Sequence, residues 1–489
     1  MKTSVKQPAG LKVFCGSILF ERYGFYLVQS LLILYLVKFF RMDDNIAYGI
    51  SGSFIALSYI TPLIGGFIAD KYWGLKRSVF IGSLIECLGV ICLLLPWQLM
   101  MHLGLSILAV GVGLLKPSAS SLLGYLYKEN DPHQDAGYTI FYMAFCIGIT
   151  IAASIAGFLV RYLGWSFAFL TAIAAFIMTY LIFYFGIIHY RLQNLGKNTK
   201  TMTQSSLVPI AITLCTILLS FIILTSEWIA IVVFIAVSIS VIGIFIYCIT
   251  KSEKRYKNTL VAFFILLIIS VFFWAMYMQL FLSILLFIEN VVDKSLLGIN
   301  IPSSAFISIE AFGIVIFGYP LAKLWLFLGK TKYNPSIPAK FGISMVLLSI
   351  SFAILASSFS FKETSALINP LWIIIAYLIL SIAELAFSPI GLSMVKTLVP
   401  PEFNGMMMGI FLLTIGLGGK IAGTLAKIAK VPAAMSHNIS AIGIIYHHAF
   451  SVYLLILLIC TLITILFIPY IHKKIKQELP LSLTQELLL

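Results

Sequence analysis

The sequence predicts an all-α integral membrane protein with about fourteen spanning helices. Of its 489 residues, 61% are hydrophobic and only 10% are charged, and the mean hydropathy is +1.05. A water-soluble domain needs a much larger share of charged residues on its surface than this chain contains. The apolar residues also gather into runs of roughly 20 residues, the length that crosses the hydrocarbon core of a bilayer.

These runs form groups of six, two and six along the chain. The first six spans are expected near 12–38, 46–69, 78–97, 101–124, 137–160 and 166–189. The polar stretch RLQNLGKNTKTMTQSS precedes two runs near 207–225 and 228–250, and six others follow KSEKRYK and end near Tyr470. We therefore expect an N-terminal six-helix bundle over 1–190, a polar linker with two additional helices over 191–257, and a C-terminal six-helix bundle with a cytoplasmic tail over 258–489.

Lysine and arginine residues predict the orientation, because short loops rich in these residues remain in the cytoplasm. The connections richest in them fall on one side of the membrane, together with the C-terminal end, and contain Lys71, Lys76, Arg77, Arg191, Lys197, Lys200, Lys251, Lys254, Arg255, Lys257, Lys473, Lys474 and Lys476. Lys427 and Lys430, near the penultimate connection, do not fit this pattern. The distribution as a whole places both termini in the cytoplasm.

Other function classes find little support in the sequence. The net charge of +14 comes from short loops between spans rather than from one basic face, which argues against a nucleic-acid partner. The seven cysteines are odd in number and lie mostly inside apolar runs, so neither a disulfide framework nor a metal site is expected. Because no nucleophile with a base and no cofactor motif is evident, a membrane enzyme is a distant alternative and no cofactor is expected.

Two six-span halves joined by a polar linker are typical of a transporter whose site lies at the midplane between the halves. An ionisable residue at that depth costs at least about 2.5 kcal/mol and normally faces a cavity or a partner. The predicted spans contain a short set of them: Glu21, Arg22, Glu86, Lys116, Glu310, Glu384 and Lys420.

The signs of these charges favour a small zwitterionic substrate. Arg22 and Lys116 in the first half would bind its carboxylate, and Glu384 in the second half would bind its amine, with Glu310 as a second candidate. The alternative is that these groups pair with one another and hold the bundle shut.

Six short motifs give the chain a family resemblance: ERYGFY, YITPLIGGFIADKYWGLKR, GLLKPSASSLLGYLY, DAGYTIFYMAFCIG, FFWAMYMQ and ELAFSPIGLSMV. In this order they resemble the conserved motifs of the proton-dependent oligopeptide transporter family, within the major facilitator superfamily. The resemblance implies the major facilitator fold, two six-helix bundles, here with two additional helices as in bacterial members. It also implies a multi-pass protein of the bacterial inner membrane that contacts lipid, peptides and protons.

The resemblance implies roles for particular residues. Glu21 matches a proton-coupling position and Arg22 a position that binds the substrate carboxylate. Positions that resemble the substrate pocket are Tyr26, Tyr59, Lys116 and Trp274, and those near the peptide's amino end are Glu384 and Ser388. Lys116 and Glu384 also match an ion pair that closes the cytoplasmic side. A conformational latch, structural rather than substrate-binding, is implied for Gly66, Asp70, Lys71, Gly74 and Arg77.

Several residues depart from the family pattern. Ile18 stands where the first-helix signature has its leading Glu, so one proton-coupling carboxylate is missing. Gln29 and Met278 replace an Arg and a Glu that can form an outer gate, and the loss of both partners avoids a lone buried charge. Cys146 and Phe411 stand at pocket positions that usually have Asn and Trp.

Glu310 departs from the family pattern in the opposite direction, because an acidic residue stands where the family usually has Asn. Unlike Asn, Glu can gain and lose a proton. We therefore expect Glu310 and Glu384 together to bind an amine or a proton in place of the acid missing at Met278. The sequence predicts a monomeric importer of di- and tripeptides that works by proton symport and alternating access. The alternative is an uncoupled or weakly coupled carrier of peptides or of another small zwitterionic or anionic metabolite.

Overall fold

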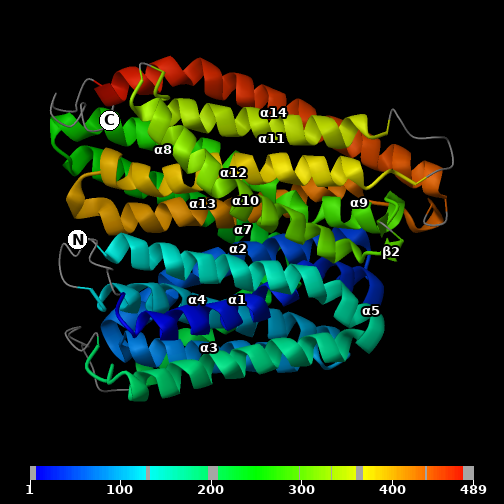
Figure 1. The fold of residues 1–489 in the computed structure, drawn as a ribbon, viewed down its shortest axis with the longest axis horizontal. Coiled ribbons are helices and arrows are strands. Elements are labelled where there is room, and N and C mark those ends of the chain that lie inside the picture. Colours follow the sequence, from blue (N-terminus) through cyan, green and yellow to red (C-terminus); the bar gives the residue numbers. More distant parts are fainter. Residues whose placement is uncertain are drawn as a thin grey trace, which may run out of the picture. The chain divides into compact units, whose positions relative to one another are not determined.

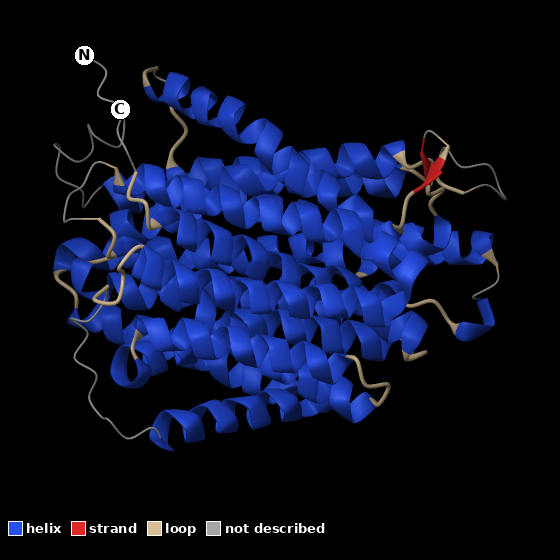
Figure 2. Cartoon of the chain, turned by 60° about the horizontal axis from the view of Figure 1, so that its bottom comes forward, coloured by secondary structure: helices blue, strands red, loops and turns tan. Residues whose placement is uncertain are grey.

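The computed structural model describes residues 7–127, 133–195, 207–296, 298–331, 333–359, 367–435 and 438–476. These residues are mostly helical, as Figure 2 shows, and the strands among them belong to one short hairpin. The chain forms two compact units, unit 1 with Met1–Asp43 and Ser53–Ala230, and unit 2 with Asp44–Gly52 and Ile231–Leu489. The first turns of the second helix therefore pack with unit 2, and the rest of that helix packs with unit 1.

Unit 1 contains most of the N-terminal helices, and each follows one of the apolar runs. They are α1 (Leu11–Leu34), α2 (Asp44–Ile68), α3 (Leu75–Leu93), α4 (Gln98–Gly124), α5 (Gln134–His189) and α6 (Leu207–Thr225). A π-helical turn continues α1 over Tyr35–Phe39, and another continues α2 over Ala69–Trp73. Within this unit α1 packs along α5 and α3 packs along α4 (Figure 1).

Two predicted spans, 137–160 and 166–189, are joined in α5. Gly164 interrupts this 56-residue helix with a φ of 83°. Glycine accepts a positive φ without the steric cost that a Cβ atom brings. The backbone therefore kinks at Gly164, and the two halves of α5 serve as separate spans.

Unit 2 contains α7 (Glu227–Lys251), most of which lies in this unit, and the helices that follow it. These are α8 (Lys254–Tyr277), α9 (Ser283–Val291), α10 (Ile307–Gly329), α11 (Ile337–Ser357), α12 (Leu371–Leu398), α13 (Asn404–Ala426) and α14 (Ile439–Lys476). Short 3₁₀ turns cover Met278–Phe281, Ser303–Phe306, Pro401–Phe403, Lys427–Ala429 and Ala433–Met435. The strands β1 (Ser295–Leu296) and β2 (Ile299–Asn300) pair antiparallel, with Ser295 opposite Asn300.

The prediction of about fourteen spans is confirmed. Twelve helical segments of the described chain are long and apolar enough to cross a membrane. One of them, Ala136–His189, contains the two spans that meet at Gly164. The 19-residue α3 falls outside this set because it carries Lys76, Arg77 and Glu86, yet it packs against α4 along its length. Counting α3 and both halves of α5 gives fourteen among the described residues.

Some sequence expectations fall partly outside the described residues. Of the polar linker, residues 196–206 lie outside them, and so does the C-terminal tail from 477 onward. The last helix ends at Lys476, slightly beyond the expected end near Tyr470. The two additional helices divide between the units, since α6 belongs to unit 1 and most of α7 to unit 2.

Candidate substrate-binding and proton-binding residues

Unit 1 holds the charged pair of the first motif in its interior. The Arg22 side chain bends back along α1 so that Nε donates to Oε2 of Glu21 and Nη2 donates to Oε1. Only 1% of the Arg22 side chain and none of the Glu21 side chain is exposed. The two-point geometry is the one that guanidinium and carboxylate groups prefer. Glu21 therefore compensates the charge of Arg22 inside the helix bundle.

Aromatic rings surround the guanidinium of Arg22. Its Cζ atom lies 5.3 Å from the ring centre of Phe25 and 5.1 Å from that of Phe145 on α5. The Tyr26 ring meets Phe145 edge to face, with their centres 6.4 Å apart. Gly148, one turn beyond Phe145, allows the close approach, because a Cβ there would lie 2.4 Å from the carbonyl oxygen of Leu19. The rings exclude water from the cation, and their electron-rich faces attract it electrostatically.

Lys116 on α4 belongs to the same cluster. Its Nζ lies 4.6 Å from the ring centre of Tyr59 on α2, and it interacts electrostatically with Arg22 and Glu21. The contact between α2 and α4 is held by Thr61, whose hydroxyl donates to the carbonyl oxygen of Ala109 at 2.7 Å. We call Glu21, Arg22, Lys116 and the rings of Tyr26 and Tyr59 the cationic cluster.

Unit 2 brings the two predicted carboxylates together. The hydroxyl of Tyr277, on α8, lies 2.9 Å from Oε1 of Glu310 on α10 and 2.7 Å from Oε2 of Glu384 on α12. Gly313 lets α10 approach α12 closely, since a Cβ there would lie 2.2 Å from the hydroxyl oxygen of Ser381. Gly313 and Ser381 each lie one turn from one of the carboxylates. We call Tyr277, Glu310 and Glu384 the acidic cluster.

The number of hydrogen atoms available for hydrogen bonding limits the charge that the acidic cluster can carry. A tyrosine hydroxyl has one hydrogen and can donate it to one acceptor, whereas an ionised carboxylate can only accept. Both oxygen–oxygen contacts of Tyr277 can be hydrogen bonds only if one of the carboxyl groups carries a proton and donates it to the hydroxyl oxygen. Glu310 and Glu384 also interact directly, and two neighbouring carboxyl groups favour a shared proton in the same way. The geometry suits a cluster that holds one proton.

The other predicted pocket residues of unit 2 lie on the helices beside this cluster. Trp274 meets Tyr277 edge to face with their centres 5.3 Å apart, and its indole Nε1 has no acceptor within the described chain. Phe411 on α13 is buried against Gly391 of α12, where a Cβ would lie 2.2 Å from its ring. Ser388, one turn beyond Glu384 on α12, is half-buried. Trp274 therefore offers an unused donor close to the acidic cluster.

The residues that replace charged gate residues are buried, each within its own unit. Gln29 on α1 and Met278 at the end of α8 are each 3% exposed. Gln279, next to Met278, donates to the carbonyl oxygen of Ala422 at 2.9 Å and accepts a hydrogen bond from Ser283 at 2.6 Å. Cys146, which was expected at a pocket position, is buried on α5. Met278 is thus an uncharged side chain at a buried position.

The residues of the predicted latch lie around the π-helical turn that follows α2. Asp70, Lys71 and Arg77 are exposed, and Lys71 lies 4.9 Å from the ring centre of Phe67. Gly74 takes a φ of 77°, which a residue with a side chain rarely adopts. Gly66 has no heavy atom within 4 Å of a Cβ placed on it. The turn is therefore specified by Gly74, and the charged residues around it face outward.

Two residues that the sequence assigned no role lie beside these clusters. Glu86 on α3 is buried next to Glu21 and Arg22, with which it interacts electrostatically. Tyr377 on α12 is buried, its hydroxyl has no partner among the described residues, and it interacts with Glu310. Glu86 was visible in the sequence as a charge within a span. Tyr377 was not, because nothing in an apolar run marks one tyrosine as the neighbour of a carboxylate.

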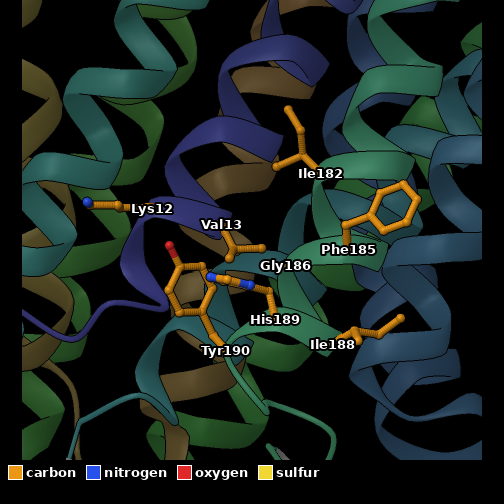
Figure 3. A pocket seen from close by; sticks show the side chains of 8 residues that line it. All are labelled: Lys12, Val13, Ile182, Phe185, Gly186, Ile188, His189 and Tyr190. Atoms are coloured by element: carbon orange, nitrogen blue, oxygen red, sulfur yellow. The ribbon is translucent and has the colours of Figure 1, made fainter.

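An open surface pocket of about 550 Å³ lies elsewhere in unit 1, where α1 begins and α5 ends (Figure 3). Figure 3 shows Lys12 and Val13 of α1 on one side and Ile182 and Phe185 of α5 on the other. Gly186 forms part of its lining, and a Cβ there would lie 2.5 Å from Val13. None of the predicted site residues lines this pocket.

Comparison with known proteins agrees with the fold and the motifs. A family model described as the POT family matches residues 76–445. Dipeptide and tripeptide permease A of Chromobacterium violaceum is 29% identical over 483 residues, covering 97% of this chain and 96% of the relative. Dipeptide and tripeptide permease A of Erwinia pyrifoliae is 30% identical over 452 residues, covering 90% and 89%.

A solved structure shares the architecture as well. The crystal structure of tetrameric PepTSo2 superimposes with a TM-score of 0.83 at 25% identity, covering 95% of this chain and 98% of that one. The chain is a multi-pass membrane protein whose helices are arranged as in PepTSo2. On the family match, the relatives and the shared fold, it belongs to the POT family.

Proposed function

We propose that this protein imports di- and tripeptides by proton symport with alternating access. The single observation that carries this proposal is the separation of charge, with two cations in the cationic cluster and two carboxyl groups around one hydroxyl in the acidic cluster. A short peptide carries one carboxylate and one ammonium group whatever its side chains are. Clusters of opposite sign recognise what all such peptides share. The relatives named as dipeptide and tripeptide permeases support this substrate class.

The peptide carboxylate binds to the cationic cluster. In the empty state Nε and Nη2 of Arg22 both donate to Glu21, so a substrate carboxylate has to compete with Glu21 for these two donors. Lys116 adds a second positive charge beside the pair. The guanidinium offers a planar fork to a carboxylate and the ammonium offers a point charge, so together they select an anionic end group.

The peptide ammonium group binds to the acidic cluster. Glu384 is only partly buried and can face the substrate, whereas Glu310 is buried behind it. Glu310 and Tyr277 hold the carboxyl group of Glu384 in position through the shared hydroxyl. An arriving ammonium group pairs with the ionised carboxylate of Glu384, because opposite charges stabilise each other. The cluster therefore keeps its proton on Glu310 while Glu384 binds the substrate amine.

The coupling of proton movement to peptide movement follows from changes in the charge of the carboxyl groups in the two clusters. When a carboxyl group of the cationic cluster gains a proton, the pairing of Arg22 weakens and the peptide carboxylate is favoured. Proton and peptide together then shift the protein toward its inward-facing state, and release restores the pairing. The ligands can drive this shift only if they bind the two states with different affinity. We propose that Glu21, Glu310 and Glu384 take part in this proton exchange.

The membrane topology and the oligomeric state of the protein follow from the same proposal. The loops rich in lysine and arginine support a topology in which both termini lie in the cytoplasm of a bacterial cell and the chain spans its inner membrane. One chain carries both clusters, so a monomer is the transport unit. A carrier without proton coupling is the competing possibility, because Ile18 and Met278 stand where acids were expected.

Competition for uptake tests the substrate class. The purified protein is reconstituted in liposomes loaded with unlabelled dialanine, and exchange with labelled dialanine outside is followed. Di- and tripeptides should compete, whereas free alanine and tetra-alanine should compete poorly. Exchange that free amino acids inhibit as well as dipeptides, or the absence of any exchange, would contradict the proposal.

A further inference from the structure

Glu86 is a buried carboxyl group that accepts no hydrogen bond from the described residues. It lies in the middle of α3, its side chain is 0% exposed, and neither of its carboxyl oxygens has a donor within the described chain. An ionised carboxylate in such a place is costly, because burial removes its water without replacing it. The neutral acid is much easier to accommodate.

The helices around Glu86 bring it to the cationic cluster. From α1, Glu21 and Arg22 interact with it electrostatically, and on its own helix Cys87 does so. From α4 the facing residue is Gly111, where a Cβ would lie 2.6 Å from the Cγ of Glu86. The absence of a side chain at Gly111 leaves the space that the acid fills.

Other charged groups act on the cluster but do not pair with Glu86. Lys116 of α4 interacts with Arg22 and Glu21. On α5 the ring of Phe145 covers the guanidinium. Asp70 and Lys71, in the π-helical turn packed against α3, are exposed. The ion pair of Glu21 and Arg22 is thus the charged neighbour that acts on Glu86.

The hydrogen bonds that Arg22 makes in the structure go to Glu21 and not to Glu86. The Nε and Nη2 atoms of Arg22 both donate to Glu21. The carboxyl groups of Glu86 and Glu21 are close enough to hydrogen-bond each other, which two carboxyl groups can do only when one of them carries a proton. Protonation of Glu86 displaces no hydrogen bond. Protonation of Glu21, by contrast, would remove one of the two oxygens that accept hydrogen bonds from Arg22.

We propose that Glu86 and Glu21 share the transported proton in unit 1, that Glu86 is the residue that carries it, and that its protonation prepares the cationic cluster for the peptide carboxylate. With Glu86 ionised, two carboxylates balance Arg22 and Lys116. With Glu86 protonated, the four groups carry one net positive charge, which attracts an anion. Glu21 is the single acidic residue of α1, so the second carboxyl group of this cluster comes from α3. This assignment rests on the proposed peptide transport.

Substitution Glu86→Gln tests it in the full-length protein, since the amide resembles the protonated acid in shape and charge. Binding of dialanine in weakly buffered detergent solution is measured across a range of pH, together with the protons taken up. For the unmodified protein the Kd should fall with falling pH by up to about tenfold per pH unit, the limit for one linked proton. In the variant the Kd should stay near its low-pH value, and proton uptake per peptide should fall by up to about one.

The same variant should retain exchange of dialanine across liposomes and lose much of its accumulation under a proton gradient. Its Tm at neutral pH should match or exceed that of the unmodified protein, because a neutral group replaces an unpaired buried acid. Glu402→Gln makes the same chemical change on an exposed 3₁₀ turn and should alter none of these quantities.

Two results would overturn the assignment. One is an unchanged pH profile and proton uptake in Glu86→Gln. The other is a large fall in Tm, which would mean that the negative charge of Glu86 holds the fold together. Failure of the unmodified protein to bind dialanine would contradict the peptide proposal instead, and the comparison of Tm values would still decide whether Glu86 is neutral.

Discussion

The hydroxyl of Tyr277 lies between two carboxyl groups, 2.9 Å from Glu310 and 2.7 Å from Glu384. This relationship joins α8, α10 and α12 within unit 2. It also requires a proton beyond the hydroxyl's own, because one hydrogen cannot serve both contacts. Tyr277 therefore sets both the position and the protonation of the group proposed to bind the peptide amine.

Replacement of this hydroxyl should weaken substrate binding. In Tyr277→Phe the carboxyl groups lose the donor that orients them, and a hydrogen bond to a charged group contributes about 1.5–3 kcal/mol. The Kd for dialanine should rise about tenfold or more. Binding measured by calorimetry checks this, with Tyr319→Phe, an exposed tyrosine on α10, as control. Equal affinity in Tyr277→Phe and the control would show that the hydroxyl does not position the site.

Removal of the titratable group at Glu310 should change the pH dependence of uptake. In the native cluster a proton must be gained before transport, so uptake rises as the external pH falls. Glutamine at 310 resembles the protonated acid at every pH, so uptake should vary less with pH and accumulation should fall. Initial uptake rates of dialanine across pH provide the measurement. A pH profile of Glu310→Gln that superimposes on the native one would exclude a role for Glu310 in proton exchange.

Arg22 should give the site a specificity for the substrate carboxylate, and Lys at this position should not reproduce that specificity. Arg22→Lys keeps the charge but removes the planar fork and its packing against Phe25 and Phe145. The native protein should prefer dialanine over dialaninamide, whose C-terminus is uncharged, and the variant should lose about tenfold of this preference. Competition assays with both ligands measure it. Arg161→Lys, an exposed arginine on α5, makes the same change away from the cluster and should keep the native ratio.

Gly111 should tolerate no larger side chain. A Cβ at this position would lie 2.6 Å from the Cγ and 2.8 Å from the backbone nitrogen of Glu86, so α3 and α4 would have to separate. Overpacking of this kind typically costs about 1–3 kcal/mol. Gly111→Ala should therefore lower the Tm and reduce uptake. Gly243→Ala on α7, where no heavy atom lies within 4 Å, should leave the Tm unchanged, and equal Tm values in both variants would contradict the packing argument.

The spans were predictable from sequence because each is a local property. Length and apolar content mark a helix that crosses a bilayer, and the kink at Gly164 falls where the two predicted spans of α5 are divided. The Glu21–Arg22 pair was also visible, since the two residues are adjacent and lie in an apolar run. Such features need no knowledge of which helices are neighbours.

The arrangement around Tyr277 and Glu86 was not predictable, because it depends on how helices distant in sequence pack. Tyr277 reaches two carboxyl groups only because Gly313 and Ser381 let α10 and α12 approach. Glu86 meets the ion pair only because the glycines of α3 and α4 set the register between those helices. A single sequence gives the residue types but not these distances.

Proton-driven accumulation distinguishes a symporter from an uncoupled carrier, and it can be measured in reconstituted liposomes. Labelled dialanine is supplied outside, with and without an inward proton gradient and a negative potential inside. A proton symporter should accumulate dialanine above the external concentration only when the gradient is present, and the accumulation should collapse when an ionophore dissipates the gradient. Equilibration to the external concentration whether or not the gradient is present would contradict proton symport.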